Sequence, residues 1–524
     1  MDAAAATHDV VIVGGGHNAL VAAAYLARAR RRVVVLERLD RVGGAAVSQR
    51  PWPGVDARVS RYSYLVSLLP RRIVNDLGLR IDLRRRRYSS YTPDPQHPSR
   101  GVLIDTMDAS ATAASFARTV GAEREADRFA AFVSRLAPLA RAVFPTMTEP
   151  LPSATALRRR VGDDALWHAV AEAPLGDLLR ASLDTDLARG IALTDGLIGT
   201  FSYADDPSLR QNRCFLYHVI GGGTGDWDVP VGGMGEVSAQ LERAARAAGA
   251  ELRTGATVTA VSPDGEVAVD GGPALRGRLV LSGVGDAVLH DLLRSGGTDS
   301  TVAPEHAPEG AQLKVNMLLR RLPRLRDAHV VPQAAFAGTF HINETMAQLD
   351  GAYSAAEAGG IPSPLPAEVY CHSLTDPTIL GPELRASGAQ TITLFGLQLP
   401  HRLMMDGVTG EQLLDAAEHS LDAVLGEPLR PLLYDAPDGT PCIEARTTAD
   451  LERSLGMRGG DIFHGALSWP WADADAPGET PAERWGVDTA WDRVLRCGSS
   501  ARRGGGVSGI GGHNAAMAAL ELLG

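Results

Sequence analysis

The pattern of apolar and polar positions predicts a βαβ unit near the start of the chain. Residues 10–13 form a short apolar run, residues 20–29 are rich in alanine, and residues 33–36 form a second apolar run. Short apolar runs beside glycine or charged residues are typical of buried strands, whereas the middle segment has the length of a helix. Three glycines, Gly14 to Gly16, separate the first strand from the helix.

The later pattern predicts further strands and helices on either side of irregular segments. Residues 50–101 are rich in proline, which favours a lid or a crossing between domains over a third βα unit. Residues 105–200 indicate helices, with apolar positions at helical spacing in 111–132 and 165–193. Residues 257–281 predict a meander that returns to the first sheet. The remaining expected elements are strands at 251–253, 314–319, 392–399 and 494–498 and helices at 236–248 and 515–523.

The first glycine turn has the residues that a dinucleotide site requires. Gly14 permits a tight turn, Gly16 lets the backbone approach a pyrophosphate, and the small Ala19 lets the helix pack closely on the strand. The free N–H groups and positive dipole of the helix N-terminus favour phosphate, so the loop requires no lysine. Glu37 ends the second strand, where it can bind ribose hydroxyls and would repel a 2′-phosphate. The expected contacts are Gly14, Gly16, His17, Asn18, Ala19 and Glu37.

A second glycine pair favours a flavin over a nicotinamide. Residues 37–44 read Glu-Arg-Leu-Asp-Arg-Val-Gly-Gly. They resemble the second signature of the FAD-dependent glutathione-reductase-like superfamily, in which a glycine pair follows the ribose-binding acid and lies beside the pyrophosphate. The resemblance implies FAD as the cofactor and adds contacts from Arg38, Gly43, Gly44, Ala45 and, in the later meander, Val258.

The C-terminal segment is a further candidate cofactor contact. A glycine-rich run, residues 504–512, leads into the final predicted helix. A helix that begins in this way can bring its N–H groups against a ligand, and in a flavoenzyme this places positive potential near flavin N1 and O2. The expected contacts are Gly506, Ser508, Gly509, Gly512, Asn514 and Ala515.

Another glycine cluster, residues 221–225, does not have the context of a second dinucleotide site. It is followed by Asp226 and by the segment Trp227-Asp228-Val229-Pro230, which cannot begin the helix that such a site requires. We therefore expect one dinucleotide site, and no separate site for NADPH.

Composition indicates a multidomain enzyme without affinity for nucleic acid. A chain of 524 residues is too long for one ordinary core, and its 45% hydrophobic and 22% charged residues are ordinary for a globular enzyme. The net charge of -11 gives no reason to expect nucleic acid or an anionic membrane surface. The one basic run, Arg84 to Arg87, favours a solvated or carboxylate-binding face.

Cysteine spacing and the absence of targeting patterns favour a cytoplasmic location. Cys214, Cys371, Cys442 and Cys497 form no close pair, so neither a disulfide redox centre nor a zinc knuckle is expected, and we expect no metal. Residues 1–8 lack the basic and apolar regions of a signal peptide. No apolar stretch has the length of a membrane-spanning helix.

Motifs along most of the chain resemble the phytoene-desaturase-like FAD oxidoreductases of the amine oxidase and carotenoid desaturase superfamily. The motifs lie at residues 8–48, 231–235, 336–340, 460–465 and 504–516. They resemble in particular the branch named pyridine nucleotide-disulfide oxidoreductase domain-containing protein 2. The resemblance implies an α/β fold of monoamine oxidase type, with a Rossmann-type FAD domain and a substrate domain of mixed sheet and helices. The expected FAD domain comprises residues 1–90, 226–300 and 440–524, and the substrate domain 91–225 and 301–439.

Two departures from related patterns refine this expectation. The cysteine pair that the branch name suggests is missing. Amine oxidases usually carry arginine after the second glycine pair, whereas Ala45 follows Gly44 here. The second departure favours the desaturase side over a true amine oxidase.

The resemblance also suggests catalytic residues. Lys314, the only lysine in the sequence, begins a predicted strand and is similar to the lysine that holds a water at flavin N5 in amine oxidases. A cation there can assist hydride loss or the reaction of reduced flavin with oxygen. A surface lysine at a strand edge is the alternative. His464, His513 and His341 are acid or base candidates by residue type, although each is more often a packing residue.

These observations predict an FAD-dependent dehydrogenase, desaturase or oxidase. It would transfer hydride from a C–H bond of an apolar organic substrate to flavin N5 and form C=C or C=N, with oxygen, a quinone or another carrier as electron acceptor. A redox-neutral, flavin-dependent isomerase or cyclase is one alternative. A non-catalytic carrier of lipid or lipidated partners on the same fold is another, and the intact glycine turns and Glu37 argue against it. The substrate and the oligomeric state are open.

Overall fold

The computed structural model describes residues 8–122, 124–298, 307–473 and 478–524. Two predictions concern residues that lie outside this description. The prediction of no signal peptide rests mainly on residues 1–7, and one predicted domain boundary falls between residues 300 and 301. In the described part of the chain, no helix combines the length and apolar composition needed to cross a membrane.

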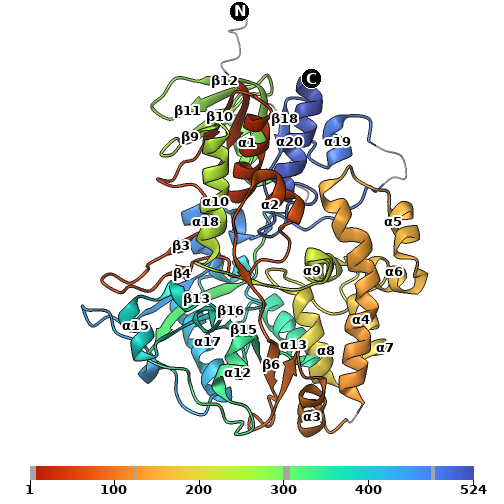
Figure 1. Cartoon of the computed structure of the whole chain (residues 1–524), viewed down its shortest axis with the longest axis vertical. Coiled ribbons are helices and arrows are strands. Elements are labelled where there is room, and N and C mark those ends of the chain that lie inside the picture. Colours follow the sequence, from red (N-terminus) through yellow and green to blue (C-terminus); the bar gives the residue numbers. More distant parts are fainter. Residues whose placement is uncertain (1–7, 123, 299–306, 474–477) are drawn as a thin grey trace, which may run out of the picture.

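The N-terminal glycine turn belongs to a seven-stranded sheet at one end of the molecule (Figure 1). Its strands are β1 His8–Val13, β2 Val33–Leu36, β9 Glu251–Arg253, β10 Val258–Val261, β11 Glu266–Val269, β12 Leu275–Ser282 and β18 Val494–Arg496. Strands β9, β2, β1, β12 and β18 lie side by side in that order and run parallel. Strands β10 and β11 continue from β12 as an antiparallel meander. The predicted βαβ unit and returning meander are confirmed.

Helices cover this sheet because its strands are apolar on both faces. The helices are α1 His17–Arg28, α10 Met234–Ala247, α11 Asp286–Ser295, α19 Pro481–Trp485 and α20 Ile510–Leu523. Val10 and Ile12 of β1 pack with α1, α10 and α20 in one core, and Val11 and Val13 pack with α11 and the meander in another. This two-sided burial is typical of parallel sheets. Helix α1 packs between α10 and α20, which its many alanines permit.

A second, mixed sheet of seven strands lies at the other end of the molecule (Figure 1). Its strands, in spatial order, are β17 Ile443–Arg446, β13 Leu313–Leu319, β16 Gln390–Gly396, β15 Ala367–Tyr370, β14 Thr339–Ile342, β6 Tyr88–Pro93 and β7 Gly101–Asp105. Phe340, Val369, Leu394 and Val315 point to an apolar face that packs against α12 Pro332–Ala337 and α17 Gly410–Val424.

The opposite face of the second sheet carries a row of polar and aromatic residues. The register places His341 opposite Glu368, Glu368 opposite Phe395, Phe395 opposite Lys314, and Lys314 opposite Arg446. Residues directly opposite one another share a face, and residues two apart on one strand do so too. A neighbouring row on the same face therefore consists of Tyr370, Thr393, Asn316 and Glu444.

Seven further α-helices lie between residues 109 and 219 in the described part of the chain. They are α3 Ala109–Val120, α4 Glu125–Val143, α5 Ala154–Val161, α6 Asp164–Ala171, α7 Leu175–Ser182, α8 Asp186–Leu193 and α9 Arg210–Val219. The helical prediction over 165–193 is confirmed, and the segment is divided into α6, α7 and α8 because Pro174 precedes α7 and Thr185 caps α8, its side chain accepting a hydrogen bond from the N–H of Ala188. The prediction over 111–132 is divided in the same way by Gly121, which has a left-handed conformation.

The proline-rich segment from residue 50 to 101 runs from the first sheet to the second. It contains β4 Val59–Ser60, α2 Arg71–Leu77 and β5 Leu83–Arg84, and it ends in β6 and β7 of the second sheet. The remaining elements are β3 Ser48–Gln49, β8 Val229–Pro230, α13 Met346–Glu357, α14 His372–Thr375, α15 Pro382–Ser387, α16 His401–Met405 and α18 Thr448–Leu455. The domain boundaries drawn from the sequence stay a prediction.

The final helix begins earlier than the sequence predicts, at Ile510 rather than Ala515. Gly509 precedes it with a left-handed backbone, φ 73°, and Gly511 and Gly512 lie within its first turn. Since glycine is a poor helix former, the pattern favours a later start. Contact with α1 overrides this propensity.

Candidate active site

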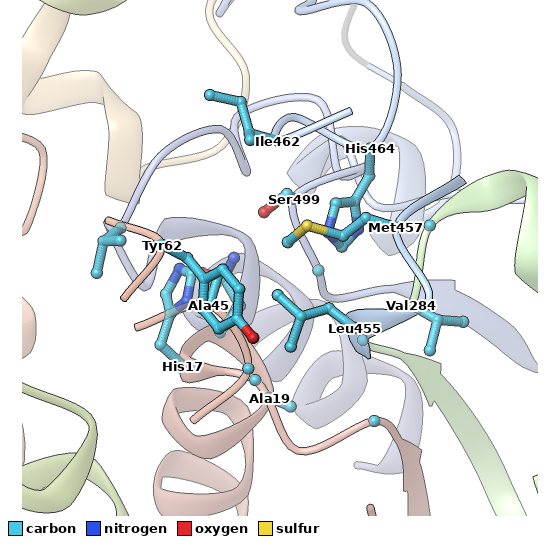
Figure 2. Close-up of a pocket in the computed structure, with 18 of the residues that line it drawn as sticks. His17, Ala19, Ala45, Tyr62, Val284, Leu455, Met457, Ile462, His464 and Ser499 are labelled. Carbon is cyan, nitrogen blue, oxygen red and sulfur yellow. The ribbon is translucent and has the colours of Figure 1, made fainter. Parts of the chain in front are cut away.

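A large cavity lies at the carboxyl ends of the parallel strands of the first sheet. Its volume is about 300 Å³, within the roughly 300–1,000 Å³ typical of a ligand pocket. Residues 13–16 after β1, 36–38 after β2, 283–285 after β12 and 498–499 after β18 all line it. Ligands of parallel α/β sheets bind at this edge, where strand order changes direction. Figure 2 shows part of the wall, with Tyr62, Met457 and His464 near the turn that carries His17 and Ala19.

The first glycine turn opens an unfilled space at the N-terminus of α1. Gly14 has a φ of 89° and Gly16 begins the helix without any side chain that caps its N–H groups. A Cβ atom placed on Gly16 would meet nothing within 4 Å. Asn18 is 3% exposed, and its Oδ1 lacks a hydrogen-bond partner among the described residues. These orphaned polar groups beside open space fit the phosphates of a dinucleotide.

The second glycine pair packs against the first turn. Gly43 donates from its N–H to the carbonyl of Gly15 at 2.8 Å, and Gly44 has a φ of 58°. A Cβ atom on Gly44 would lie 3.2 Å from the Cα of Gly16. Gly44 and Ala45 line the cavity, whereas Gly43 lies behind them, so its part is to hold the turns together.

Glu37 lies where the ribose-binding acid is expected. Its carboxylate is buried, accepting hydrogen bonds from the N–H groups of Gly15 at 2.7 Å and Leu39 at 2.9 Å. An ionised carboxylate has about four acceptor positions, so it can still bind ribose hydroxyls. Arg38 and Val258 also line this end of the cavity, and Arg38 donates to the carbonyl of Ser454.

The C-terminal glycine segment contributes its loop to the cavity and its helix to packing. Gly506 lines the cavity, and its carbonyl contacts His17 Nε2 at 3.1 Å. Ser508, Gly509, Gly512, Asn514 and Ala515 do not line it. A Cβ on Gly512 would lie 1.8 Å from the carbonyl oxygen of Asn18. Asn514 Nδ2 donates to the carbonyl of Met147 at 3.0 Å, so Gly512 and Asn514 pack against protein, and the cofactor contacts expected of this segment stay a prediction.

Three histidines, His17, His218 and His464, line the cavity, and the environment of His17 and His464 favours the neutral ring. Burial lowers the pKa of His17 and of His464 to about 4, so both imidazoles are uncharged at neutral pH. His464 has a left-handed backbone with φ 64°, and its buried Nδ1 has no partner among the described residues. A neutral, unpartnered imidazole can donate or accept a proton, so His464 remains a candidate acid or base.

His513 does not line the cavity, so the geometry gives its predicted catalytic role no support. Its ring is fully buried in α20, edge-on to Tyr25 and Trp485, and Nδ1 contacts Asn514 Oδ1 at 2.9 Å. Burial lowers the pKa of His513 to about 4.

Residues 60–65, which we call the strap, cross the polar face of the second sheet and are fastened to it. Lys314 Nζ donates to the carbonyls of Ser60 at 2.8 Å and Ser63 at 3.2 Å. Asn316 Nδ2 donates to the carbonyl of Arg61 at 3.3 Å. Tyr62 to Leu65 of the strap line the cavity on the other side. The strap therefore lies between Lys314 and the cavity, whereas Phe395 of β16, on the same face of the sheet, lines the cavity directly.

This arrangement changes the interpretation of Lys314. The side chain is 3% exposed, it does not line the cavity, and its ammonium lies 5.2 Å from the ring centroid of Tyr64. Burial lowers the pKa of Lys314 to about 7, and the carboxylate of Glu444 acts in the opposite direction. The expected place beside a cofactor has no support in this geometry, because the strap occupies that side of the lysine.

Sequence reasoning missed the residues that form the middle and far end of the cavity. They include Tyr62 and Tyr64 of the strap and a largely apolar set, Leu68, Ile198, Tyr217, Trp227, Phe395, Leu455, Met457, Ile462 and Phe463. The strap lies inside the segment that was interpreted as an irregular lid. A pair of tyrosines within a proline-rich crossing was the only available signal.

The other glycine cluster has the structure of a turn. Residues 221–223 form one short 3-10 turn, and a Cβ on Gly221 would lie 1.8 Å from Ser67 Oγ. Strand β8 follows before α10 begins, so no helix starts directly at this cluster. The four cysteines are buried and free.

Comparison with known proteins places the chain among oxidoreductases. The model of the NAD(P)-binding Rossmann-like domain matches residues 12–71. An uncharacterised protein of Mycobacterium tuberculosis is 53% identical, with 98% of this chain and 97% of that protein covered. Pyridine nucleotide-disulfide oxidoreductase domain-containing protein 2 of Rattus norvegicus is 30% identical, with 94% of this chain and 90% of the relative covered.

Solved structures share the fold at low sequence identity. A putrescine oxidase, determined with bound putrescine, is 16% identical with a TM-score of 0.57, and 98% of each chain is covered. Cyclohexylamine oxidase from Brevibacterium oxydans IH-35A is 14% identical with a TM-score of 0.56, again over 98% of each chain. These likenesses confirm the predicted fold class, a Rossmann-like domain joined to mixed sheet and helices in the manner of the amine oxidases.

Proposed function

Because the chain belongs to the family of pyridine nucleotide-disulfide oxidoreductase domain-containing protein 2, whose members are oxidoreductases, we propose that it is an FAD-dependent enzyme acting on an apolar organic substrate. It removes a hydride from a C–H bond of that substrate and forms C=C or C=N. Membership in this family also answers the alternative of a non-catalytic carrier, since the protein is an oxidoreductase.

The main support for the proposal is that one cavity combines a part suited to a dinucleotide with a part lined by apolar side chains. At one end lie the open N-terminus of α1, the paired glycine turns and Glu37, which fit the diphosphate and ribose of a dinucleotide. A buried acid beside the ribose disfavours a 2′-phosphate, and the second glycine pair favours FAD over NAD. FAD would supply the hydride acceptor when bound.

The other end of the cavity supports an apolar substrate. Leu68, Phe395 and Ile462 line the cavity together with Tyr64 of the strap. A pocket of mostly apolar side chains with a few polar groups binds its ligand by burying apolar surface and uses the polar groups for orientation. His464 is the polar group that we assign to acid or base work, since it lines the cavity and its Nδ1 is free of partners among the described residues.

The number of dinucleotide sites limits which electron acceptor can reoxidise the flavin. We assign one dinucleotide site to the chain, so reduced flavin would pass its electrons to oxygen, a quinone or another carrier. The four cysteines are free and buried, and burial raises the pKa of Cys214 to about 12, so none has the ionised thiol of a redox-active pair.

The proposal is tested by purifying the protein, recording its visible spectrum and mixing it anaerobically with a panel of apolar amines, alcohols and unsaturated hydrocarbons. A flavin spectrum that one class of compound bleaches supports the proposal. A protein that purifies without flavin and does not bind added FAD contradicts it. If a product forms with no acceptor consumed, the enzyme is the redox-neutral isomerase or cyclase instead.

A further inference from the structure

A cluster of buried acidic and basic groups lies on the polar face of the second sheet, close to the cavity. His341 on β14 and Glu368 on β15 are directly opposite in the register, and Tyr370 shares their face two residues later. Glu344 follows β14 and reaches the same point. These residues are buried: His341 is 5%, Glu344 0% and Glu368 4% exposed.

Hydrogen bonds connect this cluster to the cavity in one direction. Tyr64 of the strap, which lines the cavity, donates from its hydroxyl to the Tyr370 hydroxyl at 3.1 Å. Tyr370 in turn donates to Glu368 Oε2. Both phenols therefore point away from the cavity as donors, and a carboxylate accepts at the end of the chain. Tyr64 and Tyr370 also stack, with ring centroids 4.2 Å apart.

Beyond Glu368 the cluster continues to a second carboxylate. His341 Nδ1 lies 3.9 Å from Glu368 Oε1 and 2.6 Å from Glu344 Oε2. Thr194 donates from Oγ1 to Glu344 Oε2 at 2.7 Å. Glu344 Oε1 is buried and has no partner among the described residues. Tyr64 and Tyr370 thus link the cavity wall to Glu368, and His341 lies between Glu368 and Glu344.

The cluster has too little positive charge to hold both carboxylates ionised. In the described part of the chain, neither Glu344 nor Glu368 forms an ion pair with arginine or lysine. The charged groups that face the cluster from neighbouring elements are Arg86, which lies 5.9 Å from the Tyr370 ring, and Asp195, which adds a further negative charge. Isolated buried carboxylates are very costly, so the cluster must retain protons.

The pKa shifts of these groups agree with a cluster that keeps protons on its carboxyl groups. Burial raises the pKa of Glu368 to about 8 and the pKa of Glu344 well above its usual range, and it raises the pKa of Asp195 as well. Burial lowers the pKa of His341, which favours the neutral ring. The protons of the cluster therefore lie on carboxyl groups, and Glu368 loses its proton near pH 8.

A shared proton fits the geometry better than a metal ion does. His341, Glu344 and Glu368 each offer one ligand atom, all within 4.8 Å of one another. Ligands about 2.0 Å from a tetrahedral zinc lie about 3.3 Å apart. The 2.6 Å between His341 Nδ1 and Glu344 Oε2 is shorter and has the length of a strong hydrogen bond.

We propose that Glu368 is the acceptor for the proton that leaves the substrate during oxidation, reached from the cavity through the hydroxyls of Tyr64 and Tyr370. His341 and Glu344 are positioning residues, because they hold Glu368 and neutralise its change of charge. The inference rests on the proposed function, which requires the substrate to lose a proton as well as a hydride.

The step balances with the bound flavin as oxidant. One C–H bond of the substrate breaks with its electron pair, which leaves as hydride to the flavin. A proton leaves the adjacent carbon or nitrogen for the Tyr64 oxygen, and the electron pair of that bond becomes the new C=C or C=N bond. The Tyr64 proton moves to the Tyr370 oxygen as the Tyr370 proton moves to Glu368 Oε2. Both tyrosines are protonated before and after the step, and only Glu368 gains a proton.

The first test needs no substrate. Isotope-edited infrared spectra of the FAD-bound protein, labelled in its glutamate carboxyl groups, are recorded from pH 6 to 9 for the wild type and for Glu368→Gln. We expect a protonated carboxyl signal that disappears near pH 8 in the wild type and is absent from the variant. A Glu368 that stays protonated at every pH in this range would overturn the proposal, because a protonated carboxyl group cannot accept the substrate proton. So would a stoichiometric metal in the purified protein that Glu344→Gln removes.

The second test uses a compound found to bleach the flavin. Stopped-flow reduction is compared for the wild type, Tyr370→Phe and Tyr88→Phe, a matched change on β6 of the same sheet outside the chain of hydroxyls. Tyr370→Phe should reduce the flavin about 10²-fold more slowly, bind FAD as the wild type does, and lose the rise in rate near pH 8. Tyr88→Phe should match the wild type. Equal rates and pH profiles for Tyr370→Phe and the wild type would overturn the proposal.

Different experimental results would contradict the proposed function and the role of Glu368. A protein without flavin contradicts the proposed function, while the infrared titration of Glu368 can be measured with or without a cofactor. An FAD enzyme that is bleached by its substrate but has the wild-type profile after Tyr370→Phe keeps the proposed function and loses the proton acceptor.

Discussion

The ammonium group of Lys314 donates a hydrogen bond to the main-chain carbonyl of Ser60 at 2.8 Å. Lys314 lies on β13, next to the edge strand β17 of the second sheet, and Ser60 begins the strap that lies between this lysine and the cavity. The contact joins positions far apart in the sequence, and a second bond to the Ser63 carbonyl reinforces it. The only lysine of the chain therefore fixes the position of a cavity wall.

Lys314 should give the protein a measurable pH-dependent stability. Burial lowers its pKa from 10.5 to about 7, so between these pH values the unfolded chain binds more protons than the folded one. The free energy of unfolding then rises with pH, by up to about 1.4 kcal/mol per pH unit from this group. Urea unfolding of the wild type and Lys314→Met at pH 7, 8 and 9 should show this rise only in the wild type.

Lys314→Arg is the control for that experiment, because a guanidinium stays charged throughout this pH range and should also lack the rise. Parallel stability curves for the wild type and Lys314→Met would show that the lysine keeps an ordinary pKa. A large loss of flavin reduction in Lys314→Met at unchanged stability would instead restore the role beside the flavin that the sequence suggests.

Removal of the Glu37 carboxylate should weaken cofactor binding. Glu37→Ala loses hydrogen bonds to a charged group, about 1.5–3 kcal/mol, so FAD affinity measured by titration of apoprotein should fall roughly 10- to 150-fold. Glu251→Ala changes an exposed acid on the adjacent strand β9 and should leave the affinity unchanged. Retention of FAD by Glu37→Ala at the wild-type level would remove Glu37 from the site.

Substitution of Gly512 separates a packing role from a cofactor contact. A Cβ there would lie 1.8 Å from the carbonyl oxygen of Asn18, so Gly512→Ala should force α20 away from α1 and destabilise the apoprotein. The expected loss is about 1–3 kcal/mol, the range for overpacked sites, seen as a lower Tm without FAD. Gly351→Ala, in open space on α13, should not lower Tm. An unchanged apoprotein with weak FAD binding would favour a cofactor contact.

The assignment of one dinucleotide site predicts how the flavin is reduced. Under anaerobic conditions, NADPH or NADH alone should leave the visible flavin spectrum unchanged for minutes, while the organic substrate bleaches it. Stopped-flow mixing with each nucleotide measures this directly. Rapid bleaching by either nucleotide would require a second site that the glycine cluster at 221–225 does not provide.

The sequence by itself determined the parts that depend on local contacts. The apolar runs at 10–13 and 33–36 specify strands that are buried on both faces, and the glycines between strand and helix match the positive φ of Gly14 and the open space beside Gly16. Glu37 follows from its place at the end of β2. These features lie within one βαβ unit, where spacing along the chain fixes spacing in space.

Only the tertiary structure decided what the distant segments do. Ser508 to Ala515 were expected at the cofactor by their glycine-rich pattern, but α20 packs along α1, which turns Gly512 and Asn514 towards protein. The strap reaches Lys314 because the chain crosses from one sheet to the other at that place, which no periodicity encodes. The path from Tyr64 through Tyr370 to Glu368 depends on the register of β14, β15 and β16. A slip of one residue would turn these side chains into the apolar core, and strand patterns alone do not specify which strands pair.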